Sequence, residues 1–160
     1  MKSLLLIIDL QNGFVNEHTK EISKKVNLLL DEKRFNDVIF TRYINSENNV
    51  CYKRLNYTEC MSEESKAITI DTRGYKVIDK EGYTAVTDEL KTYIKENNIS
   101  KIYVCGIDTE CCVLKTAYDL FEQDYDVYIL SEYCACMAGN QANQNALELL
   151  KRNIGYNKVI

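Results

Sequence analysis

The sequence predicts an α/β fold: a doubly wound parallel sheet of five to six strands with helices on both faces. Short apolar runs without polar alternation are typical of strands buried on both faces, and several occur along the chain. Between them lie segments in which apolar residues recur at helical spacing. No linker, repeat or low-complexity tract interrupts this alternation, and 160 residues suit one domain, residues 1–160.

Each element follows from one of these patterns. The predicted strands are, in chain order, Leu4–Ile8, Val38–Thr41, one beginning at Val77–Ile78, Ile102–Cys105 ended by Gly106, Val127–Leu130, and a short sixth beginning at Val159. The predicted helices are those with apolar faces over 22–30, 86–94, 113–121 and 142–150. Residues 43–74 are polar and poorly periodic, so we expect mainly loop. Ligands of such sheets bind beyond the carboxyl ends of the strands, so residues just after strand ends are candidates for chemistry.

Composition excludes several classes of partner. The net charge is −4 and no basic run occurs, which argues against a nucleic-acid partner. The longest apolar run, Leu4–Ile8, is far shorter than the roughly 20 residues that span a bilayer, so we expect no membrane partner. Asp9 interrupts that run, and no signal-peptide pattern is present. We therefore expect a cytoplasmic protein whose seven cysteines are thiols.

Two charged residues stand at predicted strand ends. Asp9 directly follows five apolar residues, and a carboxylate there is costly to bury unless it is paired. Lys80 follows the third predicted strand, in the stretch Asp79-Lys80-Glu81-Gly82-Tyr83. Taken singly, each also fits an ordinary role, because aspartates often cap turns and lysines after strands are usually solvated.

The segment Gly106-Ile107-Asp108-Thr109-Glu110-Cys111-Cys112-Val113 leads from a buried strand through a turn into a helix. We expect Thr109 to cap this helix. Cys112 would then lie in the first helical turn, where free N–H groups favour an anion and lower the pKa of a thiol. The alternative is that Cys112 is a small buried hydrophobic residue.

Three segments together resemble the isochorismatase-like cysteine hydrolases, the superfamily that includes nicotinamidases and N-carbamoylsarcosine amidase. Ile8–Phe14 looks like the first-strand motif of that superfamily, and Lys80–Ala85 looks like its lysine motif. Gly106–Val113, followed by Thr116 and Ala117, looks like its nucleophile motif. The similarity runs from residue 4 to about residue 137 in matching order.

The resemblance implies a strand order of 3-2-1-4-5-6 and a catalytic triad. Cys112 would be the nucleophile, Asp9 the general acid and base, and Lys80 the cation that positions both. The expected reaction is hydrolysis of a small-molecule C–N bond, in an amide or a carbamoyl group, through a covalent intermediate on Cys112. No cofactor is expected.

Finer features of the site also follow from the resemblance. It implies a cis peptide between Ile107 and Asp108 and an oxyanion hole formed by the backbone amides of Asp108 and Cys112. Phe14 and Tyr83, which lie within the first two motifs, are weaker candidates for substrate contact.

The sequence departs from the superfamily pattern in its histidines and at Asp108. Nicotinamidases hold a metal with an aspartate and two histidines, whereas this chain has only His18, in a polar loop where we expect it to be solvated. No metal site is therefore predicted, and nicotinamidase activity is not favoured. Asp108 stands where the superfamily often has a small apolar residue. Its side chain would face solvent or meet a polar or cationic group of the substrate.

The chain is also short for the superfamily between Thr41 and Lys76, where segments that cover the substrate normally lie. We therefore expect an open pocket that a neighbouring subunit completes in a homo-oligomer, with side chains of residues 43–62 near the contact: Tyr43, Tyr52, Leu55 and Tyr57. The alternative is that these tyrosines fold back onto their own sheet.

Three other functions stay open. Isochorismatase-type hydrolysis of a vinyl ether needs no cysteine. A thiol protein that binds metal or senses oxidants would use the cysteines near the fourth and fifth strand ends: Cys105, Cys111, Cys112, Cys134 and Cys136. Their adjacent and Cys-x-Cys spacings match structural zinc sites poorly. A catalytically inactive interaction module is the third, and the presence of all three triad residues argues against it.

Overall fold

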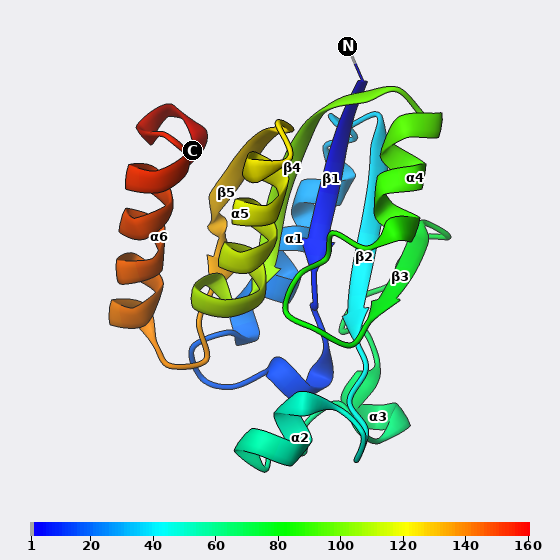
Figure 1. Cartoon of the computed structure of the whole chain (residues 1–160), viewed down its shortest axis with the longest axis vertical. Coiled ribbons are helices and arrows are strands. Elements are labelled where there is room, and N and C mark those ends of the chain that lie inside the picture. The colour runs from blue at the N-terminus through cyan, green and yellow to red at the C-terminus, as the bar shows by residue number, and fades with distance from the viewer. Residues whose placement is uncertain (1) are drawn as a thin grey trace.

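A computed structural model describes residues 2–160 of the chain, and these residues form one five-stranded parallel sheet in the order β3-β2-β1-β4-β5 (Figure 1). The strands are β1 (Lys2–Ile8), β2 (Asp37–Tyr43), β3 (Lys76–Lys80), β4 (Ile99–Ile107) and β5 (Asp126–Ala135). The predicted fold class is thus confirmed. The sixth strand is not formed, because Val159 makes only a single parallel bridge to Ile129. Gly106 does not end β4, which continues to Ile107.

The centre of the sheet is its driest part. Residues Leu4–Ile8 of β1 have no exposed surface, since β2 and β4 pair on either side and helices cover both faces. Complete burial explains why this strand shows a continuous apolar run in place of alternation. The site described below stands at the carboxyl end of this buried strand.

Four longer helices cover the sheet: α1 (Lys20–Asp31), α4 (Asp88–Glu96), α5 (Leu114–Glu122) and α6 (Asn140–Ile154). In Figure 1, α1 lies behind the sheet, α4 and α5 lie in front of it, and α6 stands beyond β5 beside α5. The buried face of α1 is the predicted one, Ile22, Val26, Leu29 and Leu30. The structure therefore confirms helices on both faces.

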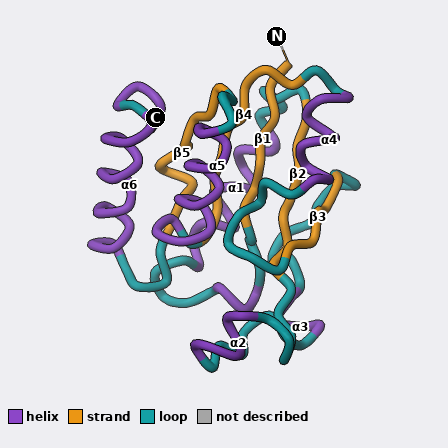
Figure 2. Tube along the Cα trace, in the orientation of Figure 1, coloured by secondary structure: helices purple, strands orange, loops and turns teal. Residues whose placement is uncertain are grey.

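The segment over residues 43–74 is not mainly loop, and that prediction was partly wrong. It contains the short helices α2 (Val50–Leu55) and α3 (Glu63–Lys66), which lie beyond the carboxyl ends of the strands (Figure 2). Asn49 caps α2 by accepting a hydrogen bond from Cys51 N at 2.8 Å, and Ser62 caps α3 by accepting one from Ser65 N. Helices this short show no hydrophobic periodicity, so only their caps could have indicated them.

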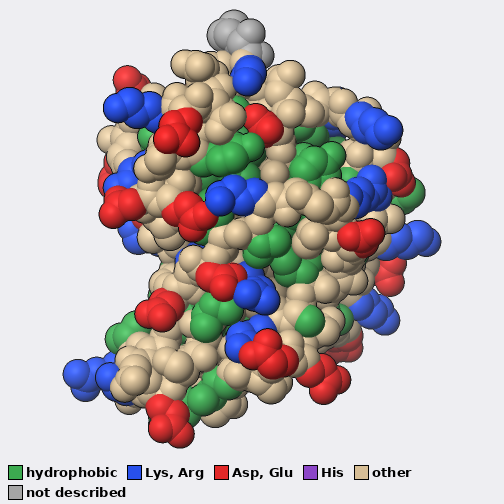
Figure 3. Space-filling view, turned by 90° about the vertical axis from the view of Figure 1, so that its right-hand side faces the viewer, with side chains coloured by type: hydrophobic (Ala, Val, Ile, Leu, Met, Phe, Trp, Pro, Cys, Tyr) green, Lys and Arg blue, Asp and Glu red, His purple; other side chains and the backbone are tan. Residues whose placement is uncertain are grey.

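On the face shown in Figure 3, Lys and Arg side chains are interspersed with Asp and Glu side chains. Among residues 2–160, no helix combines the length and the apolar character needed to cross a bilayer.

Candidate active site

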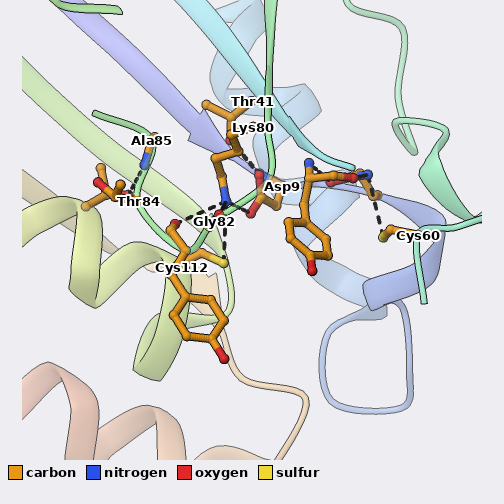
Figure 4. A network of polar contacts seen from close by, with 12 residues as sticks. Asp9, Thr41, Cys60, Lys80, Gly82, Thr84, Ala85 and Cys112 are labelled. Carbon is orange, nitrogen blue, oxygen red and sulfur yellow. Dashed lines mark hydrogen bonds and ion pairs between the residues drawn. The ribbon is translucent and has the colours of Figure 1, made fainter. Parts of the chain in front are cut away.

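The structure brings the three predicted triad residues together at the carboxyl end of the sheet. Asp9 follows β1, Lys80 ends β3, and Cys112 lies in the single π-helical turn Thr109–Val113 (η2) between β4 and α5. The Lys80 ammonium stands between the other two side chains (Figure 4). Its Nζ is 2.7 Å from Asp9 Oδ2 and 3.7 Å from Cys112 Sγ.

Asp9 is completely buried and is held by its neighbour on β2. Its Oδ1 accepts a hydrogen bond from Thr41 Oγ1 at 2.6 Å, and its backbone N–H donates to the same hydroxyl at 3.2 Å. Its Oδ2 contacts the Lys80 ammonium, and no other donor within residues 2–160 reaches it. Asp9 also has a φ of 46°, a left-handed conformation that non-glycine residues adopt chiefly at constrained sites.

Lys80 is 4% exposed and is saturated with acceptors. Besides Asp9 and Cys112, its ammonium donates to the carbonyls of Gly82 at 2.8 Å and Tyr83 at 3.1 Å. Burial acts to lower the pKa of Lys80, but the charges and hydrogen bonds of Asp9 and Cys112 outweigh it and raise that pKa above 10.5. Lys80 is therefore a permanent cation beneath the thiol.

Cys112 is 7% exposed, and its environment differs from the predicted one. It lies in the π-helical turn that precedes α5, and the Thr109 hydroxyl does not cap the helix but donates to Asn143 Oδ1 on α6. The pKa of Cys112 is raised, first by a hydrogen bond with the Cys111 thiol, then by burial and by the charge of Asp9, while Lys80 opposes these effects. Burial and the neighbouring charge of Asp9 thus act against the lowered pKa that the sequence predicted for Cys112.

Gly106 allows β4 to approach β1 closely at this point. Its φ is 124°, and a Cβ there would lie 2.1 Å from the carbonyl oxygen of Ile8, the residue paired with it. Only glycine, which has no Cβ, allows the two strands to come this close at Gly106. The close contact places the end of β4 next to Ile8, the residue that precedes Asp9. The peptide between Ile107 and Asp108 is cis.

A cavity of about 380 Å³ opens above Cys112. Its walls are mainly aromatic and apolar, and they include Phe14, Tyr43, Leu55, Tyr57, Tyr83 and Met137. Both residues proposed for substrate contact, Phe14 and Tyr83, thus line it. The acidic residues Asp108 and Glu110 line it as well. Asp108 is half-buried, and its Oδ1 accepts a hydrogen bond of 2.6 Å from Met137 N.

The short segment between Thr41 and Lys76 contributes to the pocket, because residues of α2 and the turn after it form one wall of the cavity. Completion of the pocket by a neighbouring subunit stays a prediction. Tyr43 folds back onto its own sheet, with 3% of its surface exposed and its ring 5.5 Å from Lys80 Nζ. Leu55 is 64% exposed, and a homo-oligomer stays a prediction.

Sequence reasoning missed three polar residues that hold the site. Thr41 orients Asp9, as described above. Gln11 is completely buried and bridges three segments, since it accepts from Tyr43 N and donates to the carbonyls of Tyr43 and Lys66. Asn49 caps α2 and donates to the carbonyl of Glu81, which ties the cover of the cavity to the lysine motif. A buried polar residue at a strand end is the signal that would have indicated Thr41 and Gln11.

A family model described as the isochorismatase domain matches residues 3–157 of the 160. The chain belongs to the isochorismatase family. Among curated relatives, isochorismatase family protein 2A of Dictyostelium discoideum is 27% identical over 80% of this chain and 64% of its own length. The secreted isochorismatase effector Isc1 of Phytophthora sojae is 31% identical over 60% of this chain and 46% of its own. The chain thus spans about half to two thirds of the length of these two family members.

Solved structures of the family superpose over nearly the whole chain. An isochorismatase-like hydrolase from Alkaliphilus metalliredigens has a TM-score of 0.86 and 19% identity, and it matches over 99% of this chain and 94% of its own. A pyrazinamidase of Pyrococcus horikoshii in complex with zinc has a TM-score of 0.84 and 22% identity over 100% and 99% of the two chains. At this identity the likeness establishes the isochorismatase-like fold.

The residues present do not fit a metal of the kind held by that zinc-bound family member. The one histidine, His18, is exposed on the surface next to Glu17. Across residues 2–160, no three His, Cys, Asp or Glu side chains converge on one point. The cysteines near the ends of β4 and β5 likewise form no such group, which gives the thiol metal-binding alternative no geometric support.

Proposed function

We propose that this isochorismatase-family protein is a cysteine hydrolase that cleaves a C–N bond in a small amide or carbamoyl compound. The observation that carries the proposal is the Lys80 ammonium in contact with both Asp9 and Cys112 at the floor of an apolar cavity. The Asp9 carboxylate and the Cys112 thiol contact the same ammonium, so the carboxylate is placed to accept the proton of the thiol during attack. The family's solved members include nicotinamidases and pyrazinamidases, which are named for amide substrates.

Asp9 is suited to move the thiol proton. Its Oδ1 is occupied by the Thr41 hydroxyl, whereas Oδ2 is free to take a proton once the Lys80 contact yields. In the first half-reaction Asp9 accepts the proton of Cys112 as the sulfur attacks the carbonyl carbon. The C–N bond then breaks, Asp9 gives the proton to the departing nitrogen, and an acyl or carbamoyl thioester remains on Cys112.

Water completes the cycle in the second half-reaction. Asp9 accepts a proton from the water that attacks the thioester, the C–S bond breaks, and the proton returns to the Cys112 sulfur. The negative charge on the carbonyl oxygen in both steps would meet the backbone amides of Asp108 and Cys112, which we propose as its oxyanion hole. In well-studied enzymes one such donor contributes about 3–4 kcal/mol to the transition state.

A substrate panel tests the proposal. We expect turnover among small primary amides and carbamoyl compounds, and loss of activity by roughly a thousandfold or more in Cys112→Ser and Asp9→Asn. Brief reaction followed by acid quench should reveal, by mass spectrometry, the acyl group on the peptide that contains Cys112. Full activity of Cys112→Ser on the best substrate would overturn the covalent mechanism. Turnover of isochorismate alone would favour the vinyl-ether alternative.

A further inference from the structure

The charges around the cavity are asymmetric. Asp108 and Glu110 both line it, whereas no Lys, Arg or His side chain does. Within residues 2–160, neither carboxylate is paired with a basic side chain. Lys80 lies below the floor, where Asp9 balances its charge. A molecule that enters the cavity therefore lies next to two acidic residues and to no basic residue of the wall.

Asp108 is held in a fixed position on the wall. Its Oδ1 accepts the hydrogen bond from Met137 N, and its backbone carbonyl accepts from Cys111 N at 3.1 Å and Val113 N at 3.0 Å. No donor within residues 2–160 reaches its second oxygen, Oδ2. A carboxylate locked on one side with a free oxygen is preorganised for a donor or cation on the ligand.

The remaining walls suit a cation equally well. The rings of Phe14, Tyr43, Tyr57 and Tyr83 line the cavity, and aromatic faces attract cations and alkyl groups. A volume of about 380 Å³ lies near the lower end of the range for small-ligand pockets. An anionic compound would have to bury its charge against Asp108 and Glu110 without a counter-ion.

We propose that the substrate carries a cationic nitrogen, such as an ammonium or amidinium group, which binds Asp108 while its amide or carbamoyl carbon lies at Cys112. The proposal deepens the proposed function and rests on it in taking Cys112 as the reacting group. It also disfavours isochorismate as a substrate, since that molecule is a dicarboxylate.

The first test does not depend on hydrolysis. Methanethiosulfonate reagents carrying a trimethylammonium or a sulfonate group react with a thiolate, forming a mixed disulfide and releasing methanesulfinate. The rate at Cys112 is followed by peptide mass spectrometry and normalised to the neutral methyl reagent and to a free thiol. At about pH 8, Asp108 is ionised, because its pKa is raised to about 6. We expect the cationic reagent to be favoured over the anionic one by about tenfold or more.

The matched variants are Asp108→Asn and Glu96→Gln. Asn removes the charge but keeps an acceptor for Met137 N, so the wall stays in place. Glu96 is an exposed carboxylate at the end of α4, remote from the cavity. Asp108→Asn should reduce the charge preference at Cys112 by about fivefold or more, and Glu96→Gln should leave it unchanged. In the protein without substitutions, equal normalised rates for the cationic and anionic reagents, or a faster rate for the anionic one, would overturn the proposal.

The second test uses three amides of similar size: 5-aminopentanamide, hexanamide and the monoamide of glutaric acid. We expect kcat/KM to fall in the order cationic, neutral, anionic, with the ratio of the first two reduced in Asp108→Asn. Hydrolysis without charge preference would refute the cation site and leave the proposed function standing. A charge preference at Cys112 without hydrolysis of any amide would refute the proposed function and leave the cation site standing.

Discussion

Replacing Lys80 by methionine should remove a large part of the free energy of unfolding of this protein. The side chains of Lys80 and Asp9 are 1% and 0% exposed and 2.7 Å apart. At an effective dielectric constant of about 20, two charges at that distance attract by about 6 kcal/mol before the cost of burying them is counted. Removing one partner leaves the other charge buried and unpaired, which typically costs about 3–5 kcal/mol. The carbonyls of Gly82 and Tyr83 lose a donor as well.

The assay is a double-mutant cycle in urea, followed by far-ultraviolet circular dichroism. We expect Lys80→Met and Asp9→Asn each to lower the free energy of unfolding by about 3–5 kcal/mol. The loss in the double variant should be smaller than the sum of the two single losses, by about 2 kcal/mol or more. Lys151→Met is the control, since its ion pair with Glu148 is exposed and should contribute less than about 1 kcal/mol. A Lys80→Met variant as stable as that control, or a coupling energy near zero, would refute the conclusion that Asp9 and Lys80 form a buried ion pair that stabilises the fold.

Four further predictions concern other parts of the molecule. Thr41→Val should cost about 1–3 kcal/mol in urea unfolding and lower kcat/KM, because Asp9 Oδ1 loses its buried donor; unchanged values for both would contradict this. Burial raises the pKa of Asp108 to about 6, so the folded state holds that proton more tightly than the unfolded state and loses stability as pH rises from about 4 to about 6. Asp108→Asn should therefore raise the free energy of unfolding by about 1 kcal/mol near neutral pH, allowing for solvent screening, and the gain should vanish below about pH 4. Activity should survive exhaustive chelation, and a loss that zinc or iron restores would contradict that expectation. Light scattering should show a dimer or larger oligomer that Leu55→Asp dissociates, and a monomer at micromolar concentration would remove the idea.

The sequence predicted the parts of this fold that depend on burial along one strand or helix. The run Leu4–Ile8 indicated a central strand because each of its residues is fully buried, and the helical spacing of α1 matched its buried face. The positions of Asp9 and Lys80 followed from the rule that parallel strands deliver their ends to one edge. The strand predicted at Val159 was wrong, because Val159 makes only one isolated bridge, and a single bridge leaves no recognisable pattern in the sequence.

The cover of the cavity could not be predicted in this way. The helix α2 has six residues, and its position depends on Asn49, which bonds to Cys51 N and to the carbonyl of Glu81, 32 residues further along the chain. Such side-chain hydrogen bonds between distant segments produce no periodic pattern in the sequence. The same holds for Gln11 and Thr41, whose partners become visible only after the strands are set side by side.

By itself, then, the sequence determined the sheet and its four longer helices, because hydrophobic periodicity is a local property of a chain, and the resemblance of three motifs to a known superfamily pointed to the set Asp9, Lys80 and Cys112. Only the tertiary structure decided which groups surround the thiol and which charged residues line the cavity. A pKa depends on burial and on charges that arrive from other elements, as Lys80 and Asp9 do at Cys112. The side chain of Asp108 likewise gained its role only when Met137, 29 residues away, fixed it against the cavity wall.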